Sequence, residues 1–258
     1  MPFTLAHPAA ILPLRRLRCL RTAPLVIGAL IPDLPYYMPG GLRLRSQTHS
    51  LAGSLTVDPL LAFVALVAVF LLRVPLTALL PARARWLCLH ALAPFRSRPL
   101  EWLIAPLAIE LGVWTHLFWD SFTHSDGWMV HRVAALSAPV TIGPYTSTVC
   151  HVLQYLSSVL GLIVLAVWYL RLPAPPPAPD SRGRARSSAA PALLLAASAA
   201  IVIGGVQATE HFARTASVYR TLEVFLTHGL AWFGVLYLVA GITVTLQAVH
   251  ERESGLGA

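Results

Sequence analysis

The chain has 258 residues, of which 56% are hydrophobic and only 12% are charged. With a mean hydropathy of +0.67, this composition excludes an ordinary soluble domain and is typical of a polytopic membrane protein. The nineteen basic residues are all arginines and the formal net charge is +8. No basic stripe is interleaved with stacking aromatic residues. The charge therefore indicates membrane topology and contact with membrane lipids, and no nucleic-acid partner is expected.

The first 40 residues contain two short apolar pieces, at about 8–20 and 22–33, with an arginine cluster between them and several prolines. Because proline ends helices, this pattern predicts a hairpin of short helices that returns His7 and Asp33 to the same depth. The alternative is one spanning helix from Thr22 to Met38, preceded by a surface helix. The arginines follow the first apolar residues, so we expect no cleavable signal peptide.

Five later runs are apolar and long enough to cross a bilayer, near residues 58–80, 100–122, 149–170, 191–209 and 225–247. They predict an all-α fold, a polytopic membrane helical bundle of about five or six spanning helices that opens with the short-helix hairpin. We expect three parts: a membrane domain at 1–170, a Pro/Arg-rich cytoplasmic linker at 171–190, and a two-helix membrane hairpin at 191–258.

Arginines gather in two of the expected loops, between Arg83 and Arg98 and between Arg171 and Arg186. The positive-inside rule places both loops in the cytoplasm. Alternation of the helices then puts residues 39–57, 123–148 and 210–224 on the outer side. We therefore expect a multi-pass membrane protein in which Asp33, His49, His116, Asp120 and His124 all lie toward the outer face.

The 100–122 segment ends in three residues of metal-ligand type, His116, Asp120 and His124. Polar groups in an apolar span are costly and usually functional. On a helix, His116 and Asp120 lie about 6 Å apart along the axis and can share an ion. The rise from His116 to His124 is roughly 12 Å, too long for one ion with bonds of about 2 Å. Either the helix breaks after Asp120 and His124 folds back, or Asp120 bridges two ions.

Three more motifs precede this helix: Met1-Pro-Phe-Thr-Leu-Ala-His7, Leu30-Ile-Pro-Asp33-Leu-Pro and Thr48-His49-Ser-Leu-Ala-Gly53. Together with His116-x3-Asp120-x3-His124, they resemble the bacterial integral-membrane domain of unknown function family 4184, over roughly residues 1–165. This resemblance implies that the chain lies in the bacterial inner (cytoplasmic) membrane, with the site facing outward. The set also resembles the LexA-regulated membrane-bound metal-dependent hydrolases and, more distantly, zinc-dependent phospholipase C.

The phospholipase resemblance implies that Asp33, His49, His116 and Asp120 surround one ion, and that Asp120 bridges to others completed by His7 and His124. The later His-x3-Glu helix of those enzymes is absent from this chain, so we expect one or two ions rather than three. His151 and Gln154 begin the next helix on the outer side, where they could donate hydrogen bonds to a metal-binding carboxylate.

These ligands are suited to a divalent metal, with zinc preferred, and an open coordination position lowers the pKa of bound water to about 7. Such a water attacks phosphoesters and amides. The leading hypothesis is therefore a membrane-bound metal-dependent hydrolase that acts at the outer face on a phosphoester or lipid-linked substrate.

Three other classes are weighed against this hypothesis. A non-enzymatic metal carrier or channel would need ligands through the whole membrane, and the inner half offers only Glu110 and Arg73. A haem protein, for instance with axial His116 and His228, would need no carboxylate between its histidines; neither haem nor a nucleotide is expected. The last class is a structural or partner-binding membrane protein.

Overall fold

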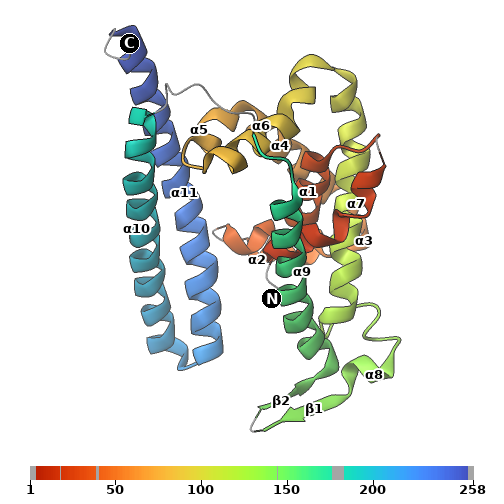
Figure 1. Ribbon diagram of the computed structural model, residues 1–258. Coiled ribbons are helices and arrows are strands. Elements are labelled where there is room, and N and C mark those ends of the chain that lie inside the picture. Colours follow the sequence, from red (N-terminus) through yellow and green to blue (C-terminus); the bar gives the residue numbers. More distant parts are fainter. Residues whose placement is uncertain (1–3, 18, 39–40, 144, 176–182, 255–258) are drawn as a thin grey trace. The chain divides into compact units, whose positions relative to one another are not determined.

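A computed structural model describes the chain apart from residues 1–3, 18, 39–40, 144, 176–182 and 255–258 (Figure 1). In the described part, five helical segments are long and apolar enough to cross a membrane: Leu51–Leu71, Leu100–Thr123, Val149–Arg171, Ala189–Thr215 and Arg220–Glu251. The prediction of an all-α, multi-pass membrane fold is confirmed. Contacts divide the chain into two compact units, of residues 1–35, 40–67 and 94–173, and of residues 36–39, 68–93 and 174–258.

The first unit opens with the expected hairpin of short helices. Its elements are η1 (Thr4–Ile11), η2 (Leu14–Arg16), α1 (Thr22–Leu30) and η3 (Ile31–Tyr37). The two ends of the hairpin meet, because the Thr4 hydroxyl donates a 2.6 Å hydrogen bond to Asp33 Oδ2. Helix α1 rises only about 14 Å, and the chain continues past Pro32 and Pro35 as a 3-10 helix. A single spanning helix from Thr22 to Met38 is therefore not formed.

The next segment differs from the predicted run at 58–80. Helices α2 (Leu42–Thr48) and α3 (Leu51–Ser54) lead into α4 (Val57–Leu71), so the spanning segment begins at Leu51. It ends at Leu71, and the separate helices α5 (Arg73–Ala78) and α6 (Ala82–Ser97) follow. Pro75 lies in the first turn of α5, where a backbone N–H is not needed for helical hydrogen bonds. Hydropathy does not register this break, because both sides of it are apolar.

Helices α7 (Leu100–Thr123) and α9 (Val149–Arg171) confirm the predicted spans at 100–122 and 149–170. Between them lie α8 (Ala134–Ser137) and an antiparallel hairpin of β1 (Pro139–Ile142) and β2 (Tyr145–Thr148), which the sequence analysis did not predict. Pro139 pairs with Thr148 and Ile142 with Tyr145. The turn uses Gly143 at a φ of +58°, a conformation that glycine adopts without strain.

Helices α1 and α7 cross at two glycines. A Cβ on Gly28 would lie 2.2 Å from the Ile109 carbonyl oxygen, and one on Gly112 would lie 2.3 Å from the Leu25 carbonyl oxygen. Neither position accepts any other residue without separating the two backbones. The crossing brings the last turn of α1 against the face of α7 that carries His116.

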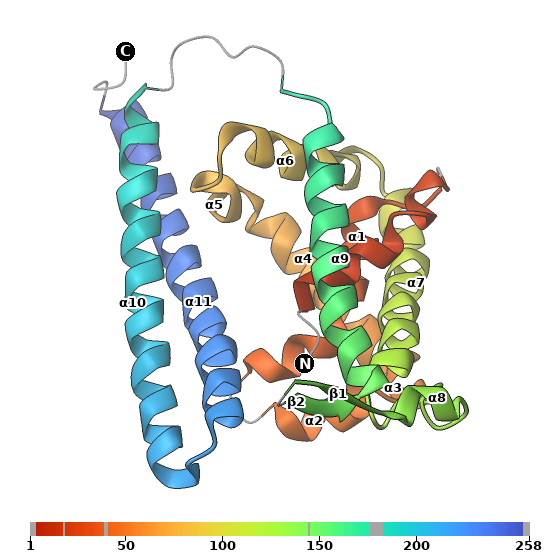
Figure 2. The same ribbon diagram turned by 60° about the horizontal axis from the view of Figure 1, so that its bottom comes forward.

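The second unit contains α5, most of α6, and the long antiparallel helices α10 (Gly183–Thr215) and α11 (Val218–Glu253), which run side by side in Figures 1 and 2. A Cβ on Gly204 would lie 3.0 Å from Gly229 Cα, so these helices pack closely. The Tyr237 hydroxyl of α11 donates a 2.9 Å hydrogen bond to the Leu76 carbonyl oxygen of α5. Helix α10 begins inside the stretch expected to be a linker, of which residues 176–182 lie outside the described part.

Candidate metal centre

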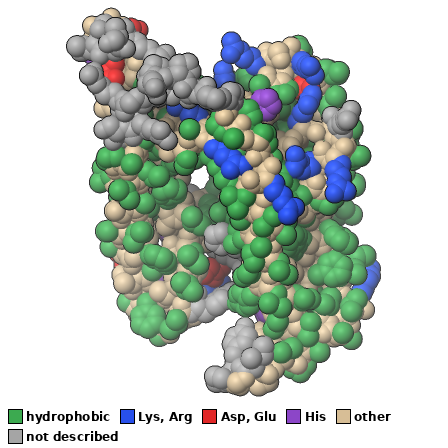
Figure 3. Space-filling model, in the orientation of Figure 1, with side chains coloured by type: hydrophobic (Ala, Val, Ile, Leu, Met, Phe, Trp, Pro, Cys, Tyr) green, Lys and Arg blue, Asp and Glu red, His purple; other side chains and the backbone are tan. Residues whose placement is uncertain are grey.

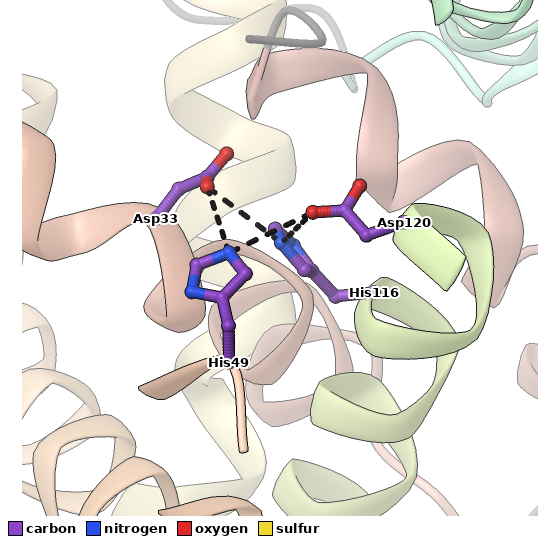
Figure 4. A group of neighbouring side chains, drawn as sticks. All are labelled: Asp33, His49, His116 and Asp120. Carbon is purple, nitrogen blue, oxygen red and sulfur yellow. Dashed lines mark ion pairs between the residues drawn. The ribbon is translucent and has the colours of Figure 1, made fainter. Parts of the chain in front are cut away.

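Four side chains of the first unit converge on one point (Figure 4). Asp33 lies on η3, His49 directly follows α2, and His116 and Asp120 lie one turn apart on α7. Each offers one ligand atom, and the four atoms all lie within 4.8 Å of one another. Three segments that are far apart in the sequence thus supply one group of potential metal ligands.

The spacing of these atoms is slightly wider than that of a metal coordination shell. His116 Nε2 lies 3.3 Å from Asp120 Oδ2 and 3.7 Å from Asp33 Oδ1. His49 Nε2 lies 3.6 Å and 3.5 Å from the same two oxygens. Around an ion with bonds of about 2.0–2.1 Å, neighbouring ligands are roughly 3.0 Å apart in an octahedron and roughly 3.4 Å apart in a tetrahedron. A small inward movement of these side chains would complete either arrangement.

Hydrogen bonds to the backbone orient both histidines. His116 Nδ1 lies 2.8 Å from the Ala29 carbonyl oxygen and His49 Nδ1 lies 3.2 Å from the Arg45 carbonyl oxygen. A carbonyl oxygen only accepts, so each Nδ1 carries the proton and donates it. In a metal-bound state, each Nε2 would offer its lone pair to the centre of the group, as in most metal-binding histidines.

Burial leaves polar atoms of this group unsatisfied. His116 is 0% and Asp120 is 5% exposed, and neither His116 Nε2 nor Asp120 Oδ2 has a hydrogen-bond partner among the described residues. A buried polar atom without a partner costs about 1–3 kcal/mol. A divalent cation at the centre would satisfy both atoms, so the residues present fit a metal ion. Their arrangement does not by itself identify the metal.

The charges of the group favour ionised carboxylates. Burial raises the pKa of Asp33, but the neighbouring imidazoles of His116 and His49 outweigh burial and hold that pKa below its usual value. Burial lowers the pKa of His49, while the neighbouring carboxylates of Asp120 and Asp33 raise it more, to about 9. Without a metal, a proton on His49 therefore balances part of the carboxylate charge.

His7 lies beside the four-residue group rather than within it. Its Nε2 is 3.0 Å from Asp120 Oδ1, the oxygen that points away from the centre, and its Nδ1 is 3.2 Å from the Thr4 carbonyl oxygen. The imidazole stacks on that of His116, with ring centroids 3.8 Å apart. His7 and Thr4 thus hold the outer oxygens of Asp120 and Asp33, and fix the direction in which the inner oxygens point.

His124 folds back toward Asp120 because α7 ends at Thr123. His124 Nδ1 lies 3.4 Å from the Asp120 carbonyl oxygen and 3.5 Å from Asp120 Oδ2. Its Nε2 accepts a 3.3 Å hydrogen bond from the amide of Gln154. Both nitrogens are therefore engaged, and His124 is not one of the four converging residues. His151 instead contacts the hydroxyls of Ser147 and Thr148, each at 3.3 Å.

Asp58 was not among the site residues predicted from the sequence. This residue lies in the first turn of α4, is 0% exposed, and neither of its carboxylate oxygens has a hydrogen-bond partner among the described residues. It interacts electrostatically with His49, His116 and Glu110. Glu110 Oε1 is also buried and has no hydrogen-bond partner within the described ranges. The sequence did offer a signal for this residue, because Asp58 is an acidic residue at the start of an apolar span and such residues usually have a function.

Solvent reaches the group beside two histidines. The His49 side chain is 17% exposed and that of the neighbouring His124 is 16% exposed, whereas Asp33, His116 and Asp120 are almost completely buried. A small polar molecule approaching the centre would therefore pass beside these two histidines.

Comparison with known proteins identifies one match. Residues 1–246 match a family described as "Domain of unknown function (DUF4184)", whereas no curated protein and no solved structure matches the chain. The match continues far beyond residue 165, where the resemblance was expected to end, and includes α10 and most of α11. Those helices are thus part of what the family shares, and the chain belongs to the DUF4184 family.

Proposed function

We propose that the protein is a membrane-bound metal-dependent hydrolase that acts on a phosphoester or lipid-linked substrate through a metal-activated water. The observation that carries the proposal is the group of two carboxylates and two imidazoles whose ligand atoms lie within 4.8 Å of one another. Two of these buried atoms have no hydrogen-bond partner in the described part of the chain. Zinc is the preferred metal, because it binds both nitrogen and oxygen ligands. The same activity would make the chain similar in function to the LexA-regulated membrane hydrolases.

Catalysis needs a coordination position that the protein does not fill. Four protein ligands would saturate a tetrahedral ion, whereas an ion with five or six ligands keeps a position for water. A metal at such a site supplies a water of lowered pKa, about 7, as nucleophile. Asp33, His49, His116 and Asp120 would hold the ion, and the partly exposed side of His49 would admit the substrate.

The distribution of arginines supports an outward-facing site. Arg21 pairs with Glu101 in the first turn of α7, and Arg15 lies over the ring of Trp168 near the end of α9. These residues join Arg96, Arg98 and Arg171 at one end of the unit, and Figure 3 shows basic side chains gathered there. His116 and Asp120 lie toward the opposite end of α7. The positive-inside rule makes the arginine-rich end cytoplasmic, although Arg43, Arg45 and Arg132 lie toward the other.

The test combines elemental analysis with activity. Purified wild type should contain about one divalent ion per chain and hydrolyse bis(p-nitrophenyl) phosphate, and Asp120→Ala should lose both. Asp126→Ala is the matched control, because Asp126 is exposed and lies six residues further along the chain. A protein that binds metal but hydrolyses neither this ester nor a phospholipid would refute the hydrolase. Unchanged metal content in Asp120→Ala would refute the site itself.

A second candidate is a non-enzymatic metal-binding or transport protein. Asp58 favours it, because this buried carboxylate lies on a second spanning helix and interacts electrostatically with His49, His116 and Glu110. Transport predicts that Asp58→Asn stops metal entry into proteoliposomes while the metal content of the purified protein is retained. Wild-type proteoliposomes that take up no metal would remove this alternative.

A further inference from the structure

A groove runs along the first unit next to the four-residue group. It has a volume of about 470 Å³, within the range of small-molecule sites. Helix α7 forms one wall and α9 the other, and Ala10 of η1 closes the base. Both helices are spanning segments, and hydrophobic side chains cover most of their visible faces (Figure 3). The groove therefore opens sideways into membrane hydrocarbon rather than into water.

The lining offers almost no free polar groups. Besides Phe118, Phe122 and Leu153, it contains three hydroxyl residues. Each hydroxyl is already bonded to its own helix: Thr115 to the Gly112 carbonyl oxygen at 2.7 Å, Thr123 to that of Trp119 at 3.4 Å, and Ser157 to that of Gln154 at 3.3 Å. What remains is methyl, methylene and ring surface, which suits a ligand without polar groups.

Trp119 separates the groove from the candidate metal centre. Its indole N–H donates a 3.1 Å hydrogen bond to the Ser157 hydroxyl across the groove, and its ring centroid lies 5.7 Å from that of His7. Gly161 of α9 leaves room for this ring, because a Cβ there would lie 3.3 Å from the indole. Trp119 thus lines the groove on one side and faces His7, the histidine that holds Asp120 Oδ1, on the other.

The groove and the potential metal ligands of α7 lie on the same two turns of that helix. Thr115, Trp119 and Thr123 each precede by one residue a member of the row His116, Asp120 and His124. Consecutive residues are turned by about 100° around a helix, so the two rows lie side by side at the same depth. The groove ends at Thr123, next to the partly exposed His124, which is the side from which the group can be approached.

We propose that this groove holds an acyl chain of the lipid whose phosphoester bond is hydrolysed at the metal centre. The inference rests on the proposed function and specifies its substrate class. From Thr115 to Thr123 the helix rises about 12 Å, close to the roughly 15 Å of hydrocarbon in one leaflet. A chain lying here has its polar end at Thr123, from which the head group reaches the centre past His124.

The role of such a groove is orientation. An acyl chain that leaves the bilayer for an apolar groove gains almost no hydrophobic free energy, because both environments are apolar. The benefit is a fixed position of the ester bond, and misplacement of a substrate by about 1 Å can slow a reaction about 100-fold. Filling the groove should therefore lower kcat and leave KM nearly unchanged.

The experiment uses the full-length protein in phosphatidylcholine vesicles. Leu153→Trp narrows the groove, and Leu160→Trp is its matched control two turns further along the exposed face of α9. The substrates are phosphatidylglycerols with six-carbon or sixteen-carbon chains and the soluble bis(p-nitrophenyl) phosphate. Leu153→Trp should slow hydrolysis of the sixteen-carbon lipid at least tenfold, change the rate on the soluble ester less than twofold, and keep its metal. Equal losses on all substrates, or no loss, would overturn the acyl-chain site.

A second measurement does not depend on catalysis. A phosphatidylglycerol with a photoreactive diazirine in its acyl chain should label residues 115–123 and 153–157 at least fivefold more than Leu103 and Leu107, which are exposed on the same helix α7. Leu153→Trp should remove this excess. Even labelling along α7 would show ordinary boundary lipid only and overturn the proposal. Concentrated labelling without hydrolysis of any ester would refute the hydrolase but support the acyl-chain site.

Discussion

Gly112 offers the sharpest test of how the fold positions the candidate metal ligands. A methyl group in Gly112→Ala would lie 2.3 Å from the Leu25 carbonyl oxygen and 2.9 Å from the Ala29 backbone nitrogen. Ordinary contact begins at 3.4 Å, so α1 and α7 must separate by roughly 1 Å, at a cost of about 1–3 kcal/mol. The 2.8 Å hydrogen bond from His116 Nδ1 to the Ala29 carbonyl oxygen would then lengthen beyond the hydrogen-bonding range.

Loss of a partner that orients a metal-binding histidine typically lowers metal affinity about 10–100-fold. We therefore expect Gly112→Ala to lower both the unfolding temperature and the zinc affinity, measured by thermal unfolding and by competition with a chromophoric chelator. Gly205→Ala is the matched control, because a Cβ at Gly205 meets nothing within 4 Å. In a helix interior, replacement of glycine by alanine should raise the free energy of unfolding by about 0.5–1 kcal/mol. Wild-type zinc affinity in Gly112→Ala would refute the reasoning.

The remaining predictions concern the chemistry of the site. Thr4→Val removes the hydrogen bond to Asp33 Oδ2 and should lower metal affinity about 10–100-fold without removing a ligand; an unchanged dissociation constant would contradict it. Protons compete with the metal for His49, whose pKa is raised to about 9. Zinc affinity should thus fall by up to about tenfold per pH unit as the pH drops from 8 to 6, and a flat profile would contradict this. The protonated His49 stabilises the metal-free fold below pH 6.5, and this contribution is lost as the pH rises toward 9. Removal of the metal should lower the unfolding temperature, because zinc at 100 times its dissociation constant contributes about 2.7 kcal/mol. Calorimetry with and without chelator measures this, and the difference should vanish in Asp120→Ala.

The sequence predicted the helical, multi-pass fold because hydropathy depends on composition over about twenty residues. It placed the spans at 100–122 and 149–170 within one residue of α7 and α9. The predicted span at 58–80 was wrong, because the spanning segment is Leu51–Leu71. The break after Leu71 lies between two apolar stretches, so hydropathy does not detect it. The strands β1 and β2 were missed because a four-residue hairpin in a loop has too little periodicity to detect.

Residue types and spacing also predicted that Asp33, His49, His116 and Asp120 could serve as metal ligands, and the structure brings these four together. Spacing alone did not decide whether His124 folds back after a helix break or binds a second ion bridged by Asp120. In the structure, α7 ends at Thr123, and the two nitrogens of His124 contact the Asp120 carbonyl oxygen and the Gln154 amide. Asp58 was overlooked although it stands in an apolar run, because its burial depends on which face of α4 packs inward.

By itself the sequence determined that the chain is a membrane protein and which residues could hold a metal, because both follow from local chemistry and helical period. The tertiary structure alone decided which oxygen or nitrogen of each residue faces the centre. That choice depends on Thr4, His7 and Ala29, three partners from another part of the chain, which occupy the other polar atom of Asp33, Asp120 and His116. It depends also on two glycines that let α1 approach α7 closely enough for the last of these contacts to form.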